Sequence, residues 1–170
     1  HRQSIREKLP ARLHPFDVFV ESPQLRLDLD QIVDLVRLLQ DCEEAVEGVT
    51  EVYNLAADMG GMGFIENNKA LCMLSVLVNT HLLMASKDRG VQKYFYASSA
   101  CVYAADKQRT TELDDGLCEE DAYPAMPEDG YGWEKLFSER MCRHFREDFG
   151  LRTRMARYHN IYGPQGTWDG

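Results

Sequence analysis

Tyr131 and Lys135 are the two residues whose types and spacing most directly indicate chemistry. They stand four positions apart in the segment Tyr-Gly-Trp-Glu-Lys, so on a helix their side chains lie on one face. An ammonium beside a phenol favours the phenolate, and we expect Lys135 to lower the pKa of Tyr131 from about 10 towards neutrality. Such a tyrosine is a usable general base for a sugar hydroxyl. On spacing alone, the alternative is an ordinary exposed turn of helix.

Ser99 and Cys101 precede this pair in the segment YFYASSACVY, residues 94–103. The segment begins as a β-prone run, and its polar residues come where the strand is expected to end. Open α/β sheets bind ligands at the carboxyl ends of their parallel strands, so we expect a hydroxyl and a thiol at that edge. The segment NLAADMGGMG, residues 54–63, ends the strand before it, and its glycines would let a ligand approach the backbone.

The elements that must position these residues alternate between helices and strands. Apolar periodicity and glycine stops predict three helices, over residues 34–47, 66–89 and 131–149. Apolar or β-prone runs predict three strands, over residues 52–57, 94–98 and 152–158. A polar, acidic loop is expected over residues 106–130. This alternation predicts an α/β fold with a doubly wound, Rossmann-like parallel sheet.

Composition and charge argue against several classes of protein. The chain has 170 residues, of which 44% are hydrophobic, and a net charge of −9, so a broad basic face for nucleic acid or an anionic membrane is not expected. Residues 70–85 form the most apolar stretch, and we expect it to be too short and too polar to span a bilayer. Five cysteines without a CxxC pair argue against a metal site or disulfides, and for a cytoplasmic location.

Three segments resemble the GDP-mannose 3,5-epimerase family of the extended short-chain dehydrogenase/reductases. They are AADMGGMGF (56–64), ASSACVY (97–103) and HNIYGPQGTW (159–168), and the resemblance extends over residues 33–170. Other nucleotide-sugar enzymes of this superfamily usually lack a cysteine at the position of Cys101, and they lack the double-glycine methionine run. The resemblance implies an NAD-dependent isomerase of the plant and algal route to ascorbate, with GDP-mannose as substrate and a homodimer in the full-length form.

The resemblance also implies a reaction and roles for four residues. NAD takes a hydride from carbon 4 of the mannose, and the resulting ketone acidifies the hydrogens on carbons 3 and 5 before NADH reduces it again, which gives GDP-L-galactose. Tyr131 would be the base at carbon 4, and Lys135 would support it and hold the nicotinamide ribose. Ser99 would hydrogen-bond near carbon 4. Cys101 would be the epimerising base, and a thiol with a pKa of about 8.5 is readily tuned for this role.

Further contacts follow from the same resemblance. Asp34 would contact the adenine of the cofactor. The resemblance implies six substrate-binding residues. Three of them, Ser99, Cys101 and Tyr131, also have catalytic roles. The other three are Gly60, Ala100 and Asn160.

The chain also departs from the family pattern. The glycine-rich pyrophosphate loop should precede Asp34, but no glycine precedes Gly48. The second catalytic lysine would lie four residues beyond Gly170, and the C-terminal substrate domain, which holds the GDP in this family, is also expected to be missing. We therefore expect residues 1–31 to be a divergent segment and residues 32–170 to be part of an NAD-binding Rossmann-like domain, a central fragment that is incomplete at its N-terminus and inactive alone.

Two alternatives remain open at this point. The chain could belong to another NAD-dependent nucleotide-sugar epimerase, dehydratase or decarboxylase of the same superfamily. It could also be a truncated, non-catalytic chain that binds only nucleotide or a full-length partner. Proton exchange at carbon 5 alone, or use of a UDP-sugar, would favour the first of these, and absence of turnover would favour the second.

Overall fold

The computed structural model describes residues 29–58, 61–108, 116–161 and 163–164, with the side chains of residues 29–36 and Met62 excepted. The chain divides into two compact units, residues 1–34 and 35–170. Of the first unit only the opening turns of helix α1 (Leu29–Ala45) are described. This helix begins five residues before the predicted position, and it ends close to the predicted stop at Gly48.

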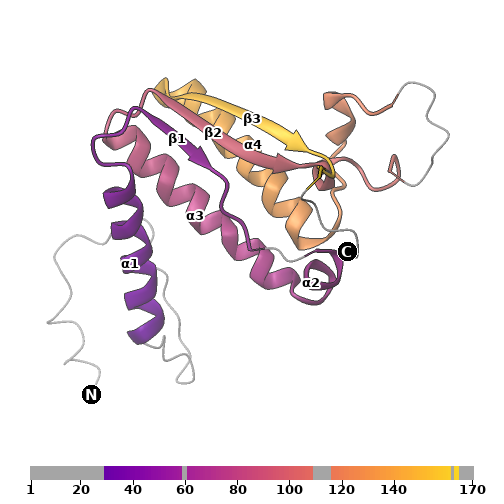
Figure 1. The fold of residues 1–170 in the computed structure, drawn as a ribbon, viewed down its shortest axis with the longest axis horizontal. Coiled ribbons are helices and arrows are strands. Elements are labelled where there is room, and N and C mark those ends of the chain that lie inside the picture. The colour runs from indigo at the N-terminus through magenta and orange to yellow at the C-terminus, as the bar shows by residue number, and fades with distance from the viewer. Residues whose placement is uncertain (1–28, 59–60, 109–115, 162, 165–170) are drawn as a thin grey trace, which may run out of the picture. The chain divides into compact units, whose positions relative to one another are not determined.

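The centre of the second unit is a parallel sheet of three strands in the order β1-β2-β3 (Figure 1). The strands are β1 (Glu51–Asn54), β2 (Lys93–Ser99) and β3 (Arg152–Tyr158). In the middle strand, Tyr94 is in register with Val52 on one side and with Thr153 on the other. The predicted parallel α/β arrangement is therefore confirmed, with the strands at the predicted places to within a few residues.

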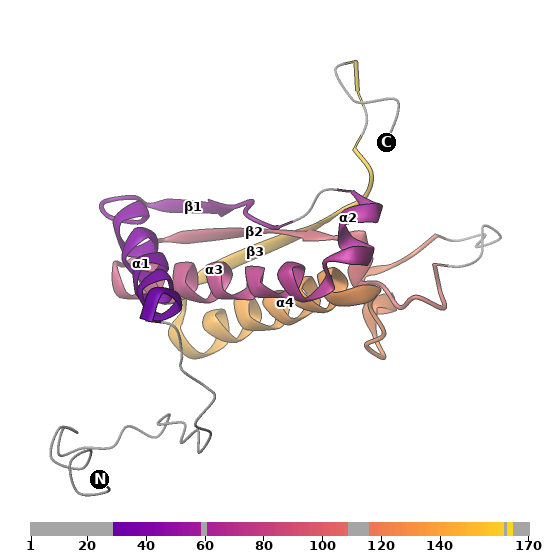
Figure 2. The ribbon, with the colours of Figure 1, turned by 90° about the horizontal axis from the view of Figure 1, so that it is seen from below.

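Helices α3 (Lys69–Asp88) and α4 (Asp129–Phe149) connect these strands, and both cover the same face of the sheet (Figure 2). Within the described residues no helix covers the opposite face. There the rings of Tyr53 and Phe95 lie 5.8 Å apart and those of Phe95 and Tyr158 6.5 Å apart, as a row of aromatic side chains. The described part of the sheet thus carries one of the two helix layers of a doubly wound fold.

The predicted single helix over residues 66–89 is two helices, α2 (Met62–Asn67) and α3. The break lies at Asn68, whose backbone leaves the helical conformation (φ −129°, ψ 40°) and whose side-chain nitrogen donates to the carbonyl oxygen of Phe64 (3.0 Å). An asparagine competes with the helical ladder through such local bonds, which apolar periodicity does not reveal. The predicted acidic loop also contains a short 3-10 helix, η3 (Glu119–Ala122).

The core lies between the sheet and its two helices. Tyr94 and Tyr96 point from β2 towards the helices and are each 1% exposed. Tyr94 donates a hydrogen bond to Asn79 of α3 (2.9 Å), and the amide of Asn54 at the end of β1 donates to both of these side chains. This buried polar triad satisfies the hydroxyl and ties β1, β2 and α3 together.

Helix α3 differs from expectation in one respect. By length and composition alone it could cross a membrane, because its 20 residues contain few charges and its best window has a mean hydropathy of 1.4. The sequence-based expectation that this stretch is too short and too polar is therefore not supported. The same properties suit a core helix, and α3 places Ser75, Asn79 and Leu83 in the buried interior.

A buried ion pair joins α4 to β3. The guanidinium of Arg157 donates to both carboxylate oxygens of Glu139 (2.9 and 2.8 Å) and to the carbonyl oxygen of Glu119 (2.6 Å). The hydroxyl of Ser98 also donates to Glu139 (2.5 Å). The side chains of Arg157 and Glu139 are 14% and 7% exposed. Each charged group is therefore stabilised mainly by its partner and little by water.

Replacement of one partner should therefore be costly. We expect Arg157→Leu to lower the free energy of unfolding by about 3 kcal/mol, since Glu139 is left buried without its counter-charge. Chemical denaturation measures this. Arg143→Leu is the control, because its pair with Glu147 is exposed and should contribute little. Equal losses in the two variants would contradict the assignment.

Candidate functional site

A cavity of about 370 Å³ opens at the carboxyl ends of the three strands. This is the edge at which parallel α/β sheets bind ligands. Six of the eight predicted site residues line it together. They are Ser99, Ala100, Cys101, Tyr131, Lys135 and Asn160.

The other two predicted site residues are not placed in this cavity. Asp34 lies in helix α1, and its side chain is outside the described part of the structure. Gly60 lies outside the described residues altogether. The roles predicted for both residues stay predictions.

Ser99 and Cys101 are presented by the turn that ends β2. Ser99 caps the short 3-10 helix η2 (Ala100–Val102), and its hydroxyl accepts a hydrogen bond from the backbone nitrogen of Cys101 (3.2 Å). The carbonyl oxygen of Cys101 accepts in turn from the backbone nitrogen of Glu128, just before α4 (3.1 Å). The half-buried thiol is therefore carried on a backbone that is fixed from both sides.

Two glycines allow the first turn of α4 to reach this backbone. A Cβ atom at Gly132 would lie 2.4 Å from the carbonyl oxygen of Cys101, and one at Gly130 would lie 2.4 Å from that of Lys69. Real Cβ atoms do not approach backbone so closely. These glycines are required by close packing, and they bring Tyr131, which stands between them, to the same cavity as Cys101.

The predicted lowering of the Tyr131 pKa is wrong for this structure. Burial raises the pKa of the phenol above its ordinary value, the nearby Cys101 and Glu134 raise it further, and a hydrogen bond with Ser99 opposes the rise. The ammonium of Lys135 lies 5.5 Å from the centre of the tyrosine ring. Desolvation favours the neutral phenol, and helical spacing alone does not reveal how deeply the pair is buried.

Lys135 is only 2% exposed. Its ammonium donates to the carbonyl oxygen of Ala97 (3.0 Å) and lies 4.8 Å from the centre of the Tyr96 ring. Burial lowers the pKa of Lys135, and the charge of Glu134 acts in the opposite direction. Tyr96 and Glu134 were not among the predicted site residues, although the alternation of side chains in β2 indicates that Tyr96 faces α4.

The donor set of the cavity fits one half of a nicotinamide dinucleotide. A phenol and an ammonium one helical turn apart, with the Ser99 hydroxyl beside them, suit the hydroxyls of a ribose and of a sugar. For the pyrophosphate half, the sequence before Gly48 contains no glycine that could form the usual loop. Within the described residues, no cluster of three or more metal-ligating side chains occurs.

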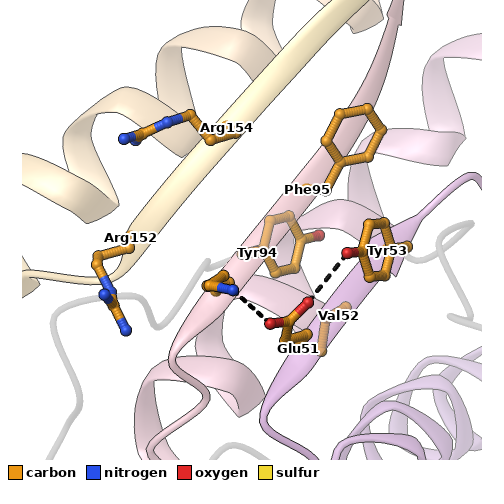
Figure 3. A pocket seen from close by; sticks show the side chains of 8 residues that line it. Glu51, Val52, Tyr53, Tyr94, Phe95, Arg152 and Arg154 are labelled. Atoms are coloured by element: carbon orange, nitrogen blue, oxygen red, sulfur yellow. Dashed lines mark hydrogen bonds and ion pairs between the residues drawn. The ribbon is translucent and has the colours of Figure 1, made fainter.

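A second cavity, of about 290 Å³, lies at the opposite end of the strands (Figure 3). It contains none of the predicted site residues. Glu51 accepts hydrogen bonds there from Lys93 (2.5 Å) and from the hydroxyl of Tyr53 (3.0 Å), and two arginines, Arg152 and Arg154, lie on β3. Because the amino ends of parallel strands are not where such sheets bind their ligands, the first cavity is the candidate site.

The parallel sheet, its crossover helices and the cavity at the carboxyl edge define a Rossmann-like protein of the epimerase/dehydratase kind. Solved structures have the same fold. The UDP-glucuronic acid 4-epimerase from Bacillus cereus, in complex with UDP-glucuronic acid and NAD, matches with a TM-score of 0.61 and 26% identity, over 76% of this chain and 39% of that one. The NAD complex of UDP-glucose 4-epimerase from Thermus thermophilus gives 0.61 and 25%, over 76% and 40%.

The chain belongs to the NAD dependent epimerase/dehydratase family, whose model matches residues 11–170. The resemblance expected from the three motifs is also confirmed. GDP-mannose 3,5-epimerase of Arabidopsis thaliana is 48% identical over 82% of this chain, and GDP-mannose 3,5-epimerase 1 of Oryza sativa subsp. japonica is 49% identical over 82%. The chain spans 37% and 36% of the length of these relatives.

The close approach at Gly132 yields a test of the site geometry. We expect Gly132→Ala to lower the free energy of unfolding by about 2 kcal/mol and to change the rate at which Cys101 reacts with a thiol reagent, because the added methyl must displace the Cys101 carbonyl. Denaturation and mass-resolved labelling measure the two effects.

Gly63→Ala is the matched control, since Gly63 is also helical and has open space around its Cβ position. An equally small effect of both substitutions would show that the backbone approach at Gly132 does not constrain the site.

Proposed function

We propose that the polypeptide containing this chain is an NAD-dependent GDP-mannose 3,5-epimerase, an isomerase that forms GDP-L-galactose through a 4-keto intermediate. One observation carries the proposal: a serine, a cysteine, a tyrosine and a lysine line one cavity at the carboxyl edge of the sheet. The 48% identity to a GDP-mannose 3,5-epimerase extends over most of this chain and adds support. The proposed roles belong to Ser99, Cys101, Tyr131 and Lys135.

In the first step, the phenolate of Tyr131 takes the proton from the hydroxyl on carbon 4 of the sugar and becomes a neutral phenol. Ser99, which interacts with this phenol, donates a hydrogen bond near the same carbon. The ammonium of Lys135 holds the ribose hydroxyls. As a cation 5.5 Å from the centre of the Tyr131 ring, it favours the phenolate against the opposing effect of burial. When bound, NAD supplies the acceptor and later the donor of the hydride at carbon 4.

In the second step, the ketone at carbon 4 makes the hydrogens on carbons 3 and 5 acidic. In this proposal the thiolate of Cys101, which lines the cavity, removes a proton from one face of the ring. A second acid must return a proton to the other face, and the resemblance assigns it to a lysine beyond Gly170. We propose Asn160, Gly60 and Ala100 as further contacts to the substrate and Asp34 as the contact to adenine.

Organisation and location are part of the same proposal. We propose that residues 1–31 form a divergent segment and residues 32–170 part of the NAD-binding domain. The five cysteines without a CxxC pair support a cytoplasmic location, and the relation to plant epimerases supports a role in ascorbate formation.

The key test concerns the thiol. We expect Cys101→Ser to reduce formation of GDP-L-galactose at least a hundredfold, because a serine hydroxyl is a far weaker acid than a thiol and is not ionised near neutral pH, while NAD binding is retained. Product chromatography and a fluorescence titration of NAD measure the two quantities.

Cys118→Ser is the matched control, since Cys118 is exposed and does not line the cavity. Epimerisation retained in the Cys101 variant would refute the role of this residue. Turnover of a UDP-sugar in place of GDP-mannose would favour another nucleotide-sugar enzyme.

A homodimer is also proposed, through the outer sides of α3 and α4. Both helices expose large apolar side chains, which would cost free energy if left in water over a continuous patch. On α4, Trp133 and Phe137 are spaced to lie on one face. The exposed set comprises Leu71, Met73, Leu74, Met84, Trp133 and Phe137.

Charge on this patch should separate the subunits. We expect Phe137→Glu to raise the dimer dissociation constant at least tenfold, because the carboxylate would be buried at the interface. Analytical ultracentrifugation measures it. Arg143→Gln changes the net charge equally at an exposed position further along α4 and should leave the constant unaltered. A monomer in all three proteins would overturn this part of the proposal.

A further inference from the structure

Glu134 is a buried carboxylate next to Lys135 that the reaction outlined above does not use. It is 2% exposed. One of its oxygens, Oε1, accepts hydrogen bonds from the hydroxyls of Tyr96 (3.1 Å) and Ser138 (2.7 Å). The other, Oε2, is buried without a hydrogen-bond partner among the described residues. A carboxylate half satisfied in this way is costly to keep, so its retention calls for a compensating role.

Tyr96 connects this carboxylate to the lysine. Its ring lies 4.8 Å from the Lys135 ammonium, and its hydroxyl donates to Glu134. The tyrosine therefore offers the cation an electron-rich face and fixes the carboxylate at the same time. The ammonium also contacts the carbonyl oxygen of Ala97, which is on β2 as well. Together they hold the lysine against the strand.

The titratable groups around Lys135 come from each element packed there. The rings of Tyr131 on α4 and Tyr96 on β2 lie beside its ammonium, and the charge of Glu134 acts on it without a direct contact. Cys101 of η2 and His159, after β3, share its cavity. Glu134 is the source of negative charge that acts on the lysine, and it also acts on the Tyr131 phenol.

We propose that Glu134, held in place by Tyr96, is a positioning residue that keeps the Lys135 ammonium charged and seated in the site. The proposal deepens the function proposed above and rests on the role given there to Lys135. It gives a role to a buried carboxylate that has one oxygen without a partner among the described residues and that precedes Lys135, a residue of the cavity wall. Glu134 acts through its neighbours and contacts no substrate.

Burial raises the pKa of Glu134, so its effect on Lys135 is that of the carboxylate formed above this raised pKa. The sign of the effect follows from the removal of that negative charge. Burial lowers the pKa of Lys135, and the charge of Glu134 opposes this. The same charge raises the pKa of Tyr131. Without it, both pKa values fall. Because activity requires a deprotonated Tyr131 and a protonated Lys135, the whole pH–rate profile should move to lower pH.

The experiment uses Glu134→Gln in the full-length polypeptide. We expect the pKa of Lys135, followed by NMR of its side-chain nitrogen, to fall by about one unit, and the pH optimum of turnover to fall with it. Asp148→Asn is the charge-matched control. Asp148 is exposed on the same helix and about 20 Å further along it, beyond the screening length in physiological salt.

A second variant provides an independent test if Glu134→Gln fails to fold. Tyr96→Phe keeps the ring beside the ammonium but removes one hydrogen bond that lowers the pKa of Glu134, so the carboxylate is neutralised at higher pH and Lys135 should shift in the same direction. A Lys135 pKa that is unchanged in both variants overturns the proposal. If the pKa falls but no variant, nor the unsubstituted protein, epimerises GDP-mannose, this inference holds and the proposed function fails.

Discussion

The site depends on one packing constraint: the first turn of α4 must lie against the backbone at the end of β2. Gly130 and Gly132 make this possible, because any side chain at either position would overlap a carbonyl oxygen. The contact places Tyr131 and Cys101 at one cavity. Helix α4 is held further along by the buried pair of Glu139 and Arg157, so the same element is fixed at the site and at its middle.

Close packing has an electrostatic consequence. A tyrosine and a lysine brought so near the sheet lose water, and desolvation raises the pKa of Tyr131 while it lowers that of Lys135. Both shifts oppose the charged pair that general-base chemistry needs. The charge of Glu134 opposes the shift of Lys135 but adds to that of Tyr131. We therefore propose that Glu134 and Tyr96 support the site through Lys135, although neither lines the cavity.

Much of the fold could be predicted from the sequence, because strands and helices here follow apolar periodicity and end at glycines such as Gly150, whose φ of 73° suits it to terminate α4. The break at Asn68 could not be predicted, since it depends on a local hydrogen bond from the Asn68 side chain to the backbone. The grouping of the site residues followed from parallel strand ends. The raised pKa of Tyr131 and the support by Glu134 could not be predicted, because burial depends on how α4 packs against β2.

The proposed epimerisation at carbons 3 and 5 is tested most directly by measuring proton exchange at these carbons. The unsubstituted full-length polypeptide is incubated with GDP-mannose and NAD in deuterium oxide, and the sugar protons are observed by NMR. We expect deuterium to enter at carbons 3 and 5, because a thiolate and a second acid exchange those protons beside a 4-ketone. Exchange at carbon 5 alone, or none while NAD and the sugar are bound, would contradict it.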